Sequence, residues 1–308
     1  MHLDGLPLAI ELAAARVKLL QPEELLTRLK SRLDLLTRGS RNLSERHRTL
    51  QNTISWSYDL LDATEQMLFT QLAVFAGGWT VEAAETVCNM GDAPLDILDG
   101  LSSLLDKSLL RQPMRDDGAL RFIMLRTIRE YALDRLVAGG EEEAVRSRHA
   151  EYYLTLAEQA VPHLQGAEQL PWLNLLEIEH DNFRAALAWA QQSGDTGTGA
   201  RLAGALGRFW FMRGYWTEGR RWLETALASN TGVAASVRVR ALNALGTLAR
   251  HQNDYDVARA QHRESLLISR ELEDKPNIAD ALRGLGDVAM WQGDNDQATA
   301  YLEFIKIY

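Results

Sequence analysis

The chain has 308 residues, of which 46% are apolar and 24% charged, and its formal net charge is −9. This composition excludes a disordered or fibrous protein, and the negative charge argues against broad neutralisation of nucleic-acid phosphates. A single cysteine, Cys88, allows no intramolecular disulfide, no apolar run is long enough to span a bilayer, and the amino-terminus lacks a cationic signal region, so we expect a soluble, cytoplasmic protein with no membrane partner.

The first predicted elements are helices. Apolar residues recur at three- and four-residue spacing over residues 6–18 and 22–36, and Pro22 suits the first turn of the second helix. A polar break at residues 39–42 precedes a further helix over residues 46–61. The chain begins close to a helix entry, so we expect it to be the regulatory part of a larger signalling protein.

The next segment predicts three short helices. Asp62 and Glu65 have the spacing of a capping box, which would open a helix that ends at Gly77-Gly78. Thr80 is expected to cap a helix that runs to Cys88. Residues 94–106 form the third predicted helix.

A β-hairpin and one more helix complete this unit. Residues 108–112 and 120–124 are short alternating segments on either side of an Asp/Gly-rich turn at 115–118, and a helix is predicted over residues 126–137. Several helices followed by a small hairpin and a helix is the order of a winged helix. A lone hairpin is marginal in water, so it must pack on these helices.

The remaining chain is predicted to be helical and contains an internal repeat. Leu245-Gly246 and Leu285-Gly286 lie 40 residues apart, and Leu206-Gly207 forms a weaker copy 39 residues earlier. Small residues at these positions indicate close helix crossings within each repeat. The period exceeds the usual tetratricopeptide length of about 34 residues, which implies longer helices or a longer loop, for example around residues 274–277.

Four phrases resemble the STAND class of signal-transduction ATPases, in particular the bacterial AfsR-like and LuxR-type large regulators. They are GLPLAIELAAARV (5–17), TLQNTISWSYDLLDATEQMLFTQLAVFAGGWTVEAAETVC (49–88), LRTIREYALDRL (125–136) and EHDNFRAALAWA (179–190). The fold class is therefore predicted as mostly α, a winged helix with a small β-hairpin followed by an α-solenoid of tetratricopeptide-like helix pairs. The predicted domains are a helical-subdomain remnant (1–40), a winged helix (41–138), a helical connector (139–195) and a repeat array (196–308) whose last copy is truncated.

The resemblance implies a nucleotide-binding core that this sequence does not contain, since it has no Walker motif. In the family, the proline of the GLPL phrase lies against the adenine ring. The matching residues are Gly5, Leu6 and Pro7. We therefore expect no cofactor in this chain, although ATP and ADP are implied for the intact protein, and a nucleotide-binding domain is an implied partner.

The repeat array supplies the candidate binding residues for a partner or effector. Aligned on the repeat glycines, eight residues fall on first-helix positions that face the concave surface of a solenoid: Arg208, Phe211, Asn243, Thr247, Arg250, Arg283, Asp287 and Trp291. Aromatic residues interleaved with Arg and Asn suit a peptide, a protein segment or a sugar-like effector. Trp210 and Trp222 occupy core-type positions and are expected to fill gaps between helices.

Other chemistry is disfavoured. Glu177 and His180 have a spacing used in metal-binding helix bundles, but no second pair accompanies them, and the histidines lack zinc-ligand spacing. No nucleophile motif is present, so we expect no catalytic and no metal-binding residues. The helix at 94–106 that would enter a DNA groove is acidic, which disfavours direct DNA binding.

The sequence therefore predicts a non-enzymatic sensor fragment of a STAND-type transcriptional regulator. Its repeats would bind a protein or small-molecule effector, and its winged helix would relay that event to a nucleotide switch; the relay follows from the resemblance. Two alternatives stay open, a stand-alone protein-interaction adaptor and a direct DNA-binding winged-helix regulator.

Overall fold

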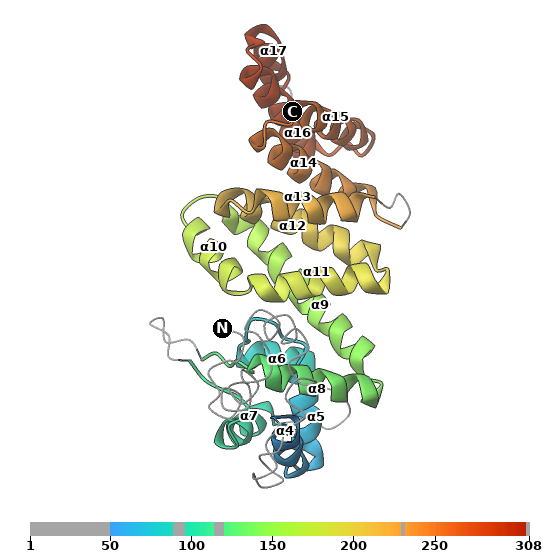
Figure 1. The fold of residues 1–308 in the computed structure, drawn as a ribbon. Helices are drawn as coiled ribbons and strands as arrows, with labels where there is room; N and C mark the ends of the chain where they lie inside the picture. Colours follow the sequence, from blue (N-terminus) through green and yellow to red (C-terminus); the bar gives the residue numbers. More distant parts are fainter. Residues whose placement is uncertain (1–49, 89–95, 114–119, 229–231, 306–308) are drawn as a thin grey trace, which may run out of the picture. The chain divides into compact units, whose positions relative to one another are not determined.

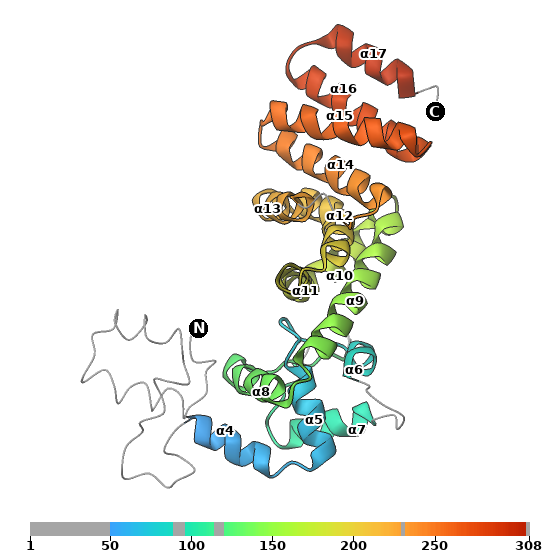
Figure 2. The same ribbon diagram turned by 90° about the vertical axis from the view of Figure 1, so that its right-hand side faces the viewer.

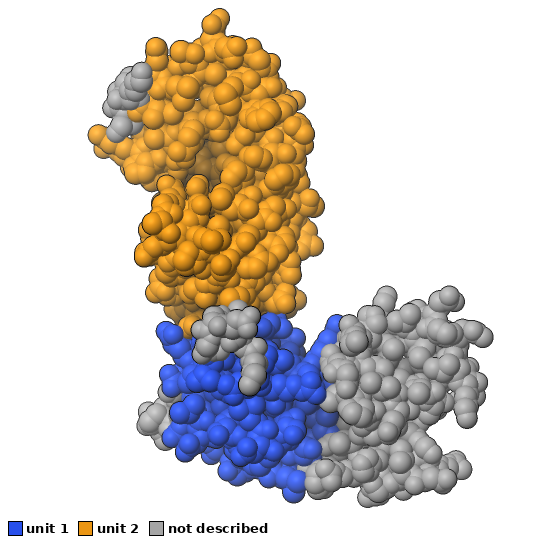
Figure 3. Space-filling view, turned by 90° about the vertical axis from the view of Figure 1, so that its left-hand side faces the viewer, with its two compact units in different colours: residues 1–148 blue, residues 149–308 orange. Residues whose placement is uncertain are grey.

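The computed structural model describes residues 50–88, 96–113, 120–228 and 232–305, which form parts of two compact units, residues 1–148 and 149–308 (Figure 3). The predicted helices at 6–18 and 22–36, and with them the remnant at 1–40, lie outside the described residues. No helix among the described residues is long and apolar enough to cross a membrane.

The first unit is a bundle of short helices (Figures 1 and 2). They are α4 (Leu50–Asp59), α5 (Ala63–Leu72), α6 (Val81–Cys88), α7 (Ile97–Asp106), α8 (Arg126–Gly139) and the first residues of α9 (Glu142–Ala160). Helix α5 packs against α6, α7 and α8. Its buried Phe69 and Leu72 and the buried Leu101 and Leu104 of α7 belong to the core of this unit.

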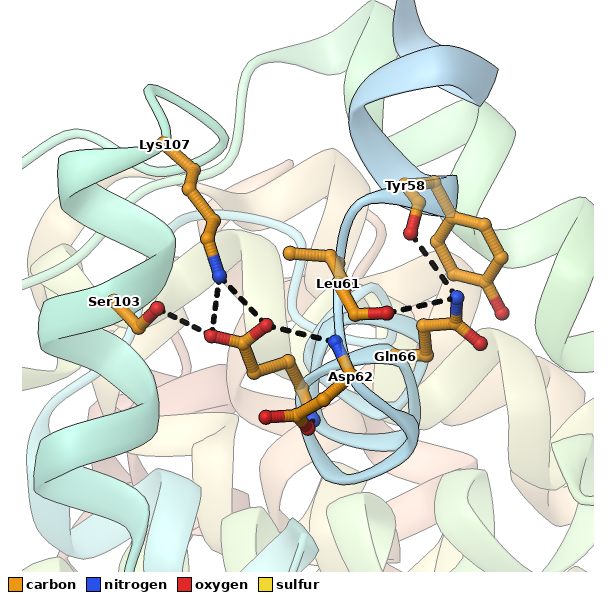
Figure 4. A network of polar contacts seen from close by, with 7 residues as sticks. Tyr58, Leu61, Asp62, Gln66, Ser103 and Lys107 are labelled. Carbon is orange, nitrogen blue, oxygen red and sulfur yellow. Dashed lines mark hydrogen bonds and ion pairs between the residues drawn. The ribbon is translucent and has the colours of Figure 1, made fainter.

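The capping box that opens α5 is confirmed. Asp62 Oδ1 accepts a hydrogen bond from the Glu65 backbone at 2.9 Å, and Glu65 Oε2 accepts one from the Asp62 backbone at 3.0 Å. Figure 4 shows that the same Glu65 carboxylate also accepts hydrogen bonds from the Ser103 hydroxyl and from Lys107 Nζ. The residue that caps α5 therefore also ties it to the end of α7.

The predicted hairpin is reduced to backbone bridges in the part of the chain that the structure describes. Arg111 pairs with Ile123, as expected for the two arms of the hairpin, whereas a second bridge joins Trp79 to Phe122 and was not predicted. Each pairing has two backbone hydrogen bonds of 2.9 Å. The pairing stays short because Val81 already begins α6, so the chain leaves the extended conformation at once.

The second unit is a stack of antiparallel helices (Figures 1 and 2). After α9 come η2 (Val161–Leu164), α10 (Gln169–Ile178) and α11 (His180–Ser193), and then three helix pairs: α12 (Thr196–Arg213) with α13 (Trp216–Leu227), α14 (Ala235–His251) with α15 (Tyr255–Glu271), and α16 (Lys275–Trp291) with α17 (Asn295–Ile305). The inner helix α14 packs against both α12 and α16.

Long helices account for the 40-residue period. Helices α14, α15 and α16 each contain 17 residues, and Asp274 caps α16 by accepting a hydrogen bond from the Asn277 backbone at 3.2 Å. A longer loop around residues 274–277 was the alternative, and it is wrong because Lys275 and Pro276 already form the first turn of α16.

One buried histidine lies between two glycines of the inner helices. His262 of α15 is 1% exposed, and its ring packs against Gly246 of α14 and Gly284 of α16. A Cβ on Gly246 would lie 2.7 Å from His262 Nε2, and one on Gly284 would lie 2.5 Å from Nδ1. Gly246 thus marks a crossing within one repeat, as predicted. Gly207 instead faces Ala244 of the following repeat, so its predicted partner helix was wrong.

Burial also sets the charge of His262. Desolvation, together with the nearby positive charges of Arg250 and Arg283, lowers its pKa to about 4. Its Nδ1 lies 3.3 Å from Asn243 Oδ1, which suits a neutral ring that donates through Nδ1. The ring is therefore neutral near pH 7.

The contact between Gly284 and His262 predicts a specific loss of stability. Gly284→Ala should lower the free energy of unfolding by about 1–3 kcal/mol, because the added methyl group overlaps the ring. Gly284→Ala in a His262→Ala background should lower the free energy of unfolding much less. Urea unfolding followed by circular dichroism measures both values. Gly286→Ala is the matched control, because its Cβ would lie 3.6 Å from the nearest atom; an equal effect of the two alanines would contradict the packing.

The lowered pKa of His262 predicts a pH dependence of stability. The unfolded state gains a proton near pH 6.5 and the folded state near pH 4, so this contribution is complete above pH 6.5 and is lost as the pH falls from 6.5 to 4. Between pH 7.5 and 5.5 the free energy of unfolding of the wild type should fall by about 1.4 kcal/mol more than that of His262→Gln. Urea unfolding at the two pH values tests this, and equal losses would show that His262 does not titrate as described.

Candidate functional site

A cavity of about 510 Å³ opens on the inner helices of the repeat array. Helices α12, α14 and α16 form most of its wall, and η2 with the following residue, Gln165, closes one side. Seven of the eight residues predicted from the repeat alignment line it: Arg208, Phe211, Asn243, Thr247, Arg250, Arg283 and Asp287. The structure therefore brings these seven side chains together around one cavity.

The eighth predicted residue lies elsewhere. Trp291, the last residue of α16, is 61% exposed and does not line the cavity. The two tryptophans predicted to fill gaps differ from each other. Trp210 is fully buried, as expected, whereas Trp222 is half-buried and lines a smaller cavity of about 110 Å³ between α11, α12 and α13.

Several lining residues were missed from the sequence. Arg240 and Asp280 lie on the inner helices, and Val161 and Leu164 come from η2. The two charged residues follow the same three- and four-residue spacing as the predicted ones, so extending that stripe along α14 and α16 would have found them. The η2 residues belong to the predicted connector, and no local sequence pattern predicts their contact with the repeat array.

Charged side chains around the cavity are held in place by specific partners. Arg250 forms an ion pair of 3.4 Å with Asp287, and Arg283 one of 2.5 Å with Asp280. Arg208 Nε donates to the Leu164 carbonyl at 2.8 Å, which fixes η2 against α12. These contacts tie α14 to α16 and η2 to α12 along the wall of the cavity.

The Asp280 carboxyl lies partly in solvent and partly against the cavity wall. Its side chain is 49% exposed, yet the surrounding cavity wall displaces enough water to raise its pKa, while Arg283 and Arg208 oppose the rise. Water reaches this carboxyl through the cavity mouth, so the ion pair with Arg283 is worth little on its own.

Two buried donors at the cavity have no hydrogen-bond partner among the described residues. They are Arg250 Nε and Asn243 Nδ2. The Asn243 carbonyl is already engaged by His262, at 3.3 Å. A buried donor without an acceptor costs about 1–3 kcal/mol, so both atoms favour an acceptor supplied by water or by a ligand.

Phe211 provides the aromatic surface of the cavity. Its ring packs edge-on against His251 with centroids 4.5 Å apart, and its carbonyl accepts a hydrogen bond of 3.1 Å from Trp216 Nε1. Burial and the neighbouring Arg250 lower the pKa of His251, while Asp287 opposes this. The neutral imidazole accepts from Arg250 at 3.1 Å, so His251 supports both Phe211 and Arg250.

The surface of α7 in the winged helix is less suited to an anionic ligand than the cavity is. Helix α7 carries Asp99 and Asp106 and is capped by Asp96, and the adjacent Lys107 is paired with Glu65 at 2.5 Å. Hydrogen bonds from Lys107 and Ser103 lower the pKa of Glu65, so this carboxylate stays charged and keeps the lysine occupied (Figure 4). The arrangement agrees with the acidic character predicted for this helix.

The Glu177 and His180 pair is taken up in packing. Glu177 accepts a hydrogen bond of 2.5 Å from the Tyr215 hydroxyl, and His180 Nε2 lies 3.3 Å from a Glu218 oxygen. Within the described ranges, no three metal-ligating side chains lie close enough together to hold an ion. The nucleotide contact expected at Gly5, Leu6 and Pro7 lies outside the described residues, so the structure gives it no geometry.

Two family models match the chain. The model of the winged helix-turn-helix domain matches residues 61–137, and that of the tetratricopeptide repeat matches residues 237–303. The predicted combination of a winged helix with tetratricopeptide-like repeats is thereby confirmed, and it is consistent with the resemblance to the STAND class.

Relatives extend the match over most of the chain. Proteins of Mycobacterium tuberculosis and Mycobacterium bovis named HTH-type transcriptional regulators are 36% identical over 297 residues, covering 92% of this chain and 33% of theirs. An uncharacterized protein of M. tuberculosis is 37% identical over 154 residues, covering 49% of this chain and 39% of its own length. The chain thus spans about a third of the length of the named regulators.

One solved structure matches most of the chain at low similarity. It is a STAND protein with a tetratricopeptide repeat sensor from Pyrococcus horikoshii, with a TM-score of 0.33 and 15% identity, and the match covers 96% of this chain and 52% of that one.

Proposed function

We propose that this chain is the sensor part of a STAND-type transcriptional regulator, and that the cavity on the repeat array binds its effector. The chain itself performs no catalysis in this proposal. The observation that carries it is that seven of the residues predicted from the repeat alignment line one cavity of about 510 Å³. Cavities of this size are typical of small-molecule sites.

The chemistry of the wall supports binding. The cavity combines an aromatic ring, Phe211, with buried donors on Asn243 and Arg250 that have no partner among the described residues. A few convergent polar groups beside apolar surface are what fixes the orientation of a ligand. Since the donors are held by rigid helices, little ordering is needed before a ligand binds.

The winged helix would relay the binding event. An effector shifts a conformational equilibrium only if it binds the two states unequally. The cavity wall is assembled from three repeats and η2, so a ligand that favours one spacing of these elements would favour one curvature of the array. In the intact protein, the winged helix would carry this change to a nucleotide-binding domain.

Two alternatives remain distinct from this proposal. In an adaptor, the array would dock a protein and the winged helix would be only structural. In a direct DNA reader, α7 would enter the major groove. The names of the relatives favour this idea, while the two acidic residues of α7, its Asp96 cap and the pairing of Lys107 oppose it. Retention on duplex DNA with a steep salt dependence would favour the reader.

A ligand screen with a blocked cavity tests the proposed function. The full chain is screened against a library of bacterial metabolites by thermal shift, and each hit is measured again by calorimetry with Thr247→Trp, which fills the cavity. Affinity should fall at least about tenfold. Thr299→Trp is the matched control, because both threonines donate to the carbonyl four residues earlier at 2.9 Å, but Thr299 is exposed and outside the cavity.

Amide hydrogen exchange separates sensing from relay. A bound hit should slow exchange in α12, α14 and α16 and also change it in α5–α8 of the winged helix. Slowing in the array alone would contradict the relay and favour the adaptor. Hits that bind Thr247→Trp as tightly as the wild type would contradict the cavity as the effector site.

A further inference from the structure

The charge of the cavity is opposite to that of the chain. The chain has a net charge of −9, yet the charged residues that line the cavity are four arginines and two aspartates: Arg208, Arg240, Arg250, Arg283, Asp280 and Asp287. We propose that the cavity selects a small anion, a carboxylate- or phosphate-bearing molecule with an apolar body. This inference rests on the proposed function and names the chemical class of its effector.

The two carboxylates already form ion pairs with the other two arginines, so Arg208 and Arg240 have no ion pair with a described residue. Asp287 pairs with Arg250 and Asp280 with Arg283. Arg208 donates to a neutral carbonyl, that of Leu164. Arg240 forms no hydrogen bond or ion pair with any described residue. A ligand can therefore bind its guanidinium group without displacing a protein partner.

The position of Arg240 directs it to the cavity. A Cβ atom on Gly204 would lie 3.5 Å from the Cγ of Arg240. Because Gly204 has no side chain, the aliphatic part of Arg240 passes close to α12 at this residue. Gly204 and Arg208 are one helical turn apart on α12, and both line the cavity. Arg208 and Arg240 therefore reach the same side of the cavity from adjacent inner helices.

The buried donors favour the same ligand. Arg250 Nε and Asn243 Nδ2 lack acceptors among the described residues, and the Asn243 oxygen is occupied by His262. A carboxylate or phosphate offers acceptors only, and guanidinium groups match its oxygens in pairs. A cationic ligand would leave both donors unsatisfied and would meet the unpaired arginines.

Apolar surface and size define the rest of the ligand. Phe211, Val161, Leu164 and Pro276 supply apolar wall beside the arginines. A volume of about 510 Å³ accommodates a small molecule with an apolar part, whereas a long acidic peptide would extend beyond the wall. The cavity thus suits an amphipathic acid better than a bare inorganic ion, although the anionic group alone should bind weakly.

Calorimetry with simple anions tests the proposal. The full chain is titrated in phosphate-free buffer at low salt with citrate, with pyrophosphate and with a hexaglutamate peptide. Citrate and pyrophosphate distinguish carboxylate from phosphate recognition. Binding of at least one of them should weaken at least about tenfold in the Arg208→Gln/Arg240→Gln double variant. Both residues are exposed, so the variant should fold, and circular dichroism checks that it does. Arg240→Gln alone keeps the hydrogen bond from Arg208 to Leu164, and it should also weaken binding.

A matched double variant excludes a general effect of charge. Arg263→Gln/Arg270→Gln makes the same charge change on exposed positions of α15 that do not line the cavity, and it should bind within about twofold of the wild type. Equal weakening in both double variants, binding of hexaglutamate alone, or no binding of citrate and pyrophosphate would each overturn the proposal. Uncharged hits that still lose affinity in Thr247→Trp would then leave the proposed function intact.

Discussion

The spacing of the inner helices depends on one aromatic contact, the packing of the His262 ring between Gly246 and Gly284. This contact holds α14 and α16 at a fixed separation through a residue of α15. Any larger residue at either glycine would push the helices apart, and the cavity wall consists of these helices together with α12. A neutral, buried imidazole therefore acts as a spacer for the site.

The spacer is also connected to the cavity chemically. The ring of His262 donates a hydrogen bond to Asn243 Oδ1. The amide nitrogen of Asn243, Nδ2, then has no acceptor among the described residues. The same electropositive surroundings, Arg250 and Arg283, help to keep the ring neutral. Packing of the repeat and chemistry of the cavity are thus set by shared residues, so a change in one is expected to affect the other.

Much of this arrangement could be predicted from the sequence because repeats place equivalent residues on equivalent faces. The glycine register located the inner helices, and with them Arg208, Asn243 and Arg250, before any coordinates were known. Local chemistry also predicted the capping box of α5 and a pairing between residues 108–112 and 120–124, which the structure shows as the bridge from Arg111 to Ile123.

What could not be predicted depends on contacts between distant segments. The η2 turn closes the cavity through Leu164, and neither its apolar residues nor its position in the connector indicates that role. The bridge from Trp79 to Phe122 depends on how the first unit folds back on itself. Trp291 was placed on the inner face by its register, but it ends α16 and lies beyond the wall.

We propose above that this chain recognises its effector in the cavity of the repeat array. A crystal structure of the full chain with a bound effector tests this most directly. Ligand oxygen atoms are expected within hydrogen-bond distance of Asn243 Nδ2 and of the Arg250 guanidinium. A ligand seated elsewhere on the chain, with both donors still unpaired, would contradict it.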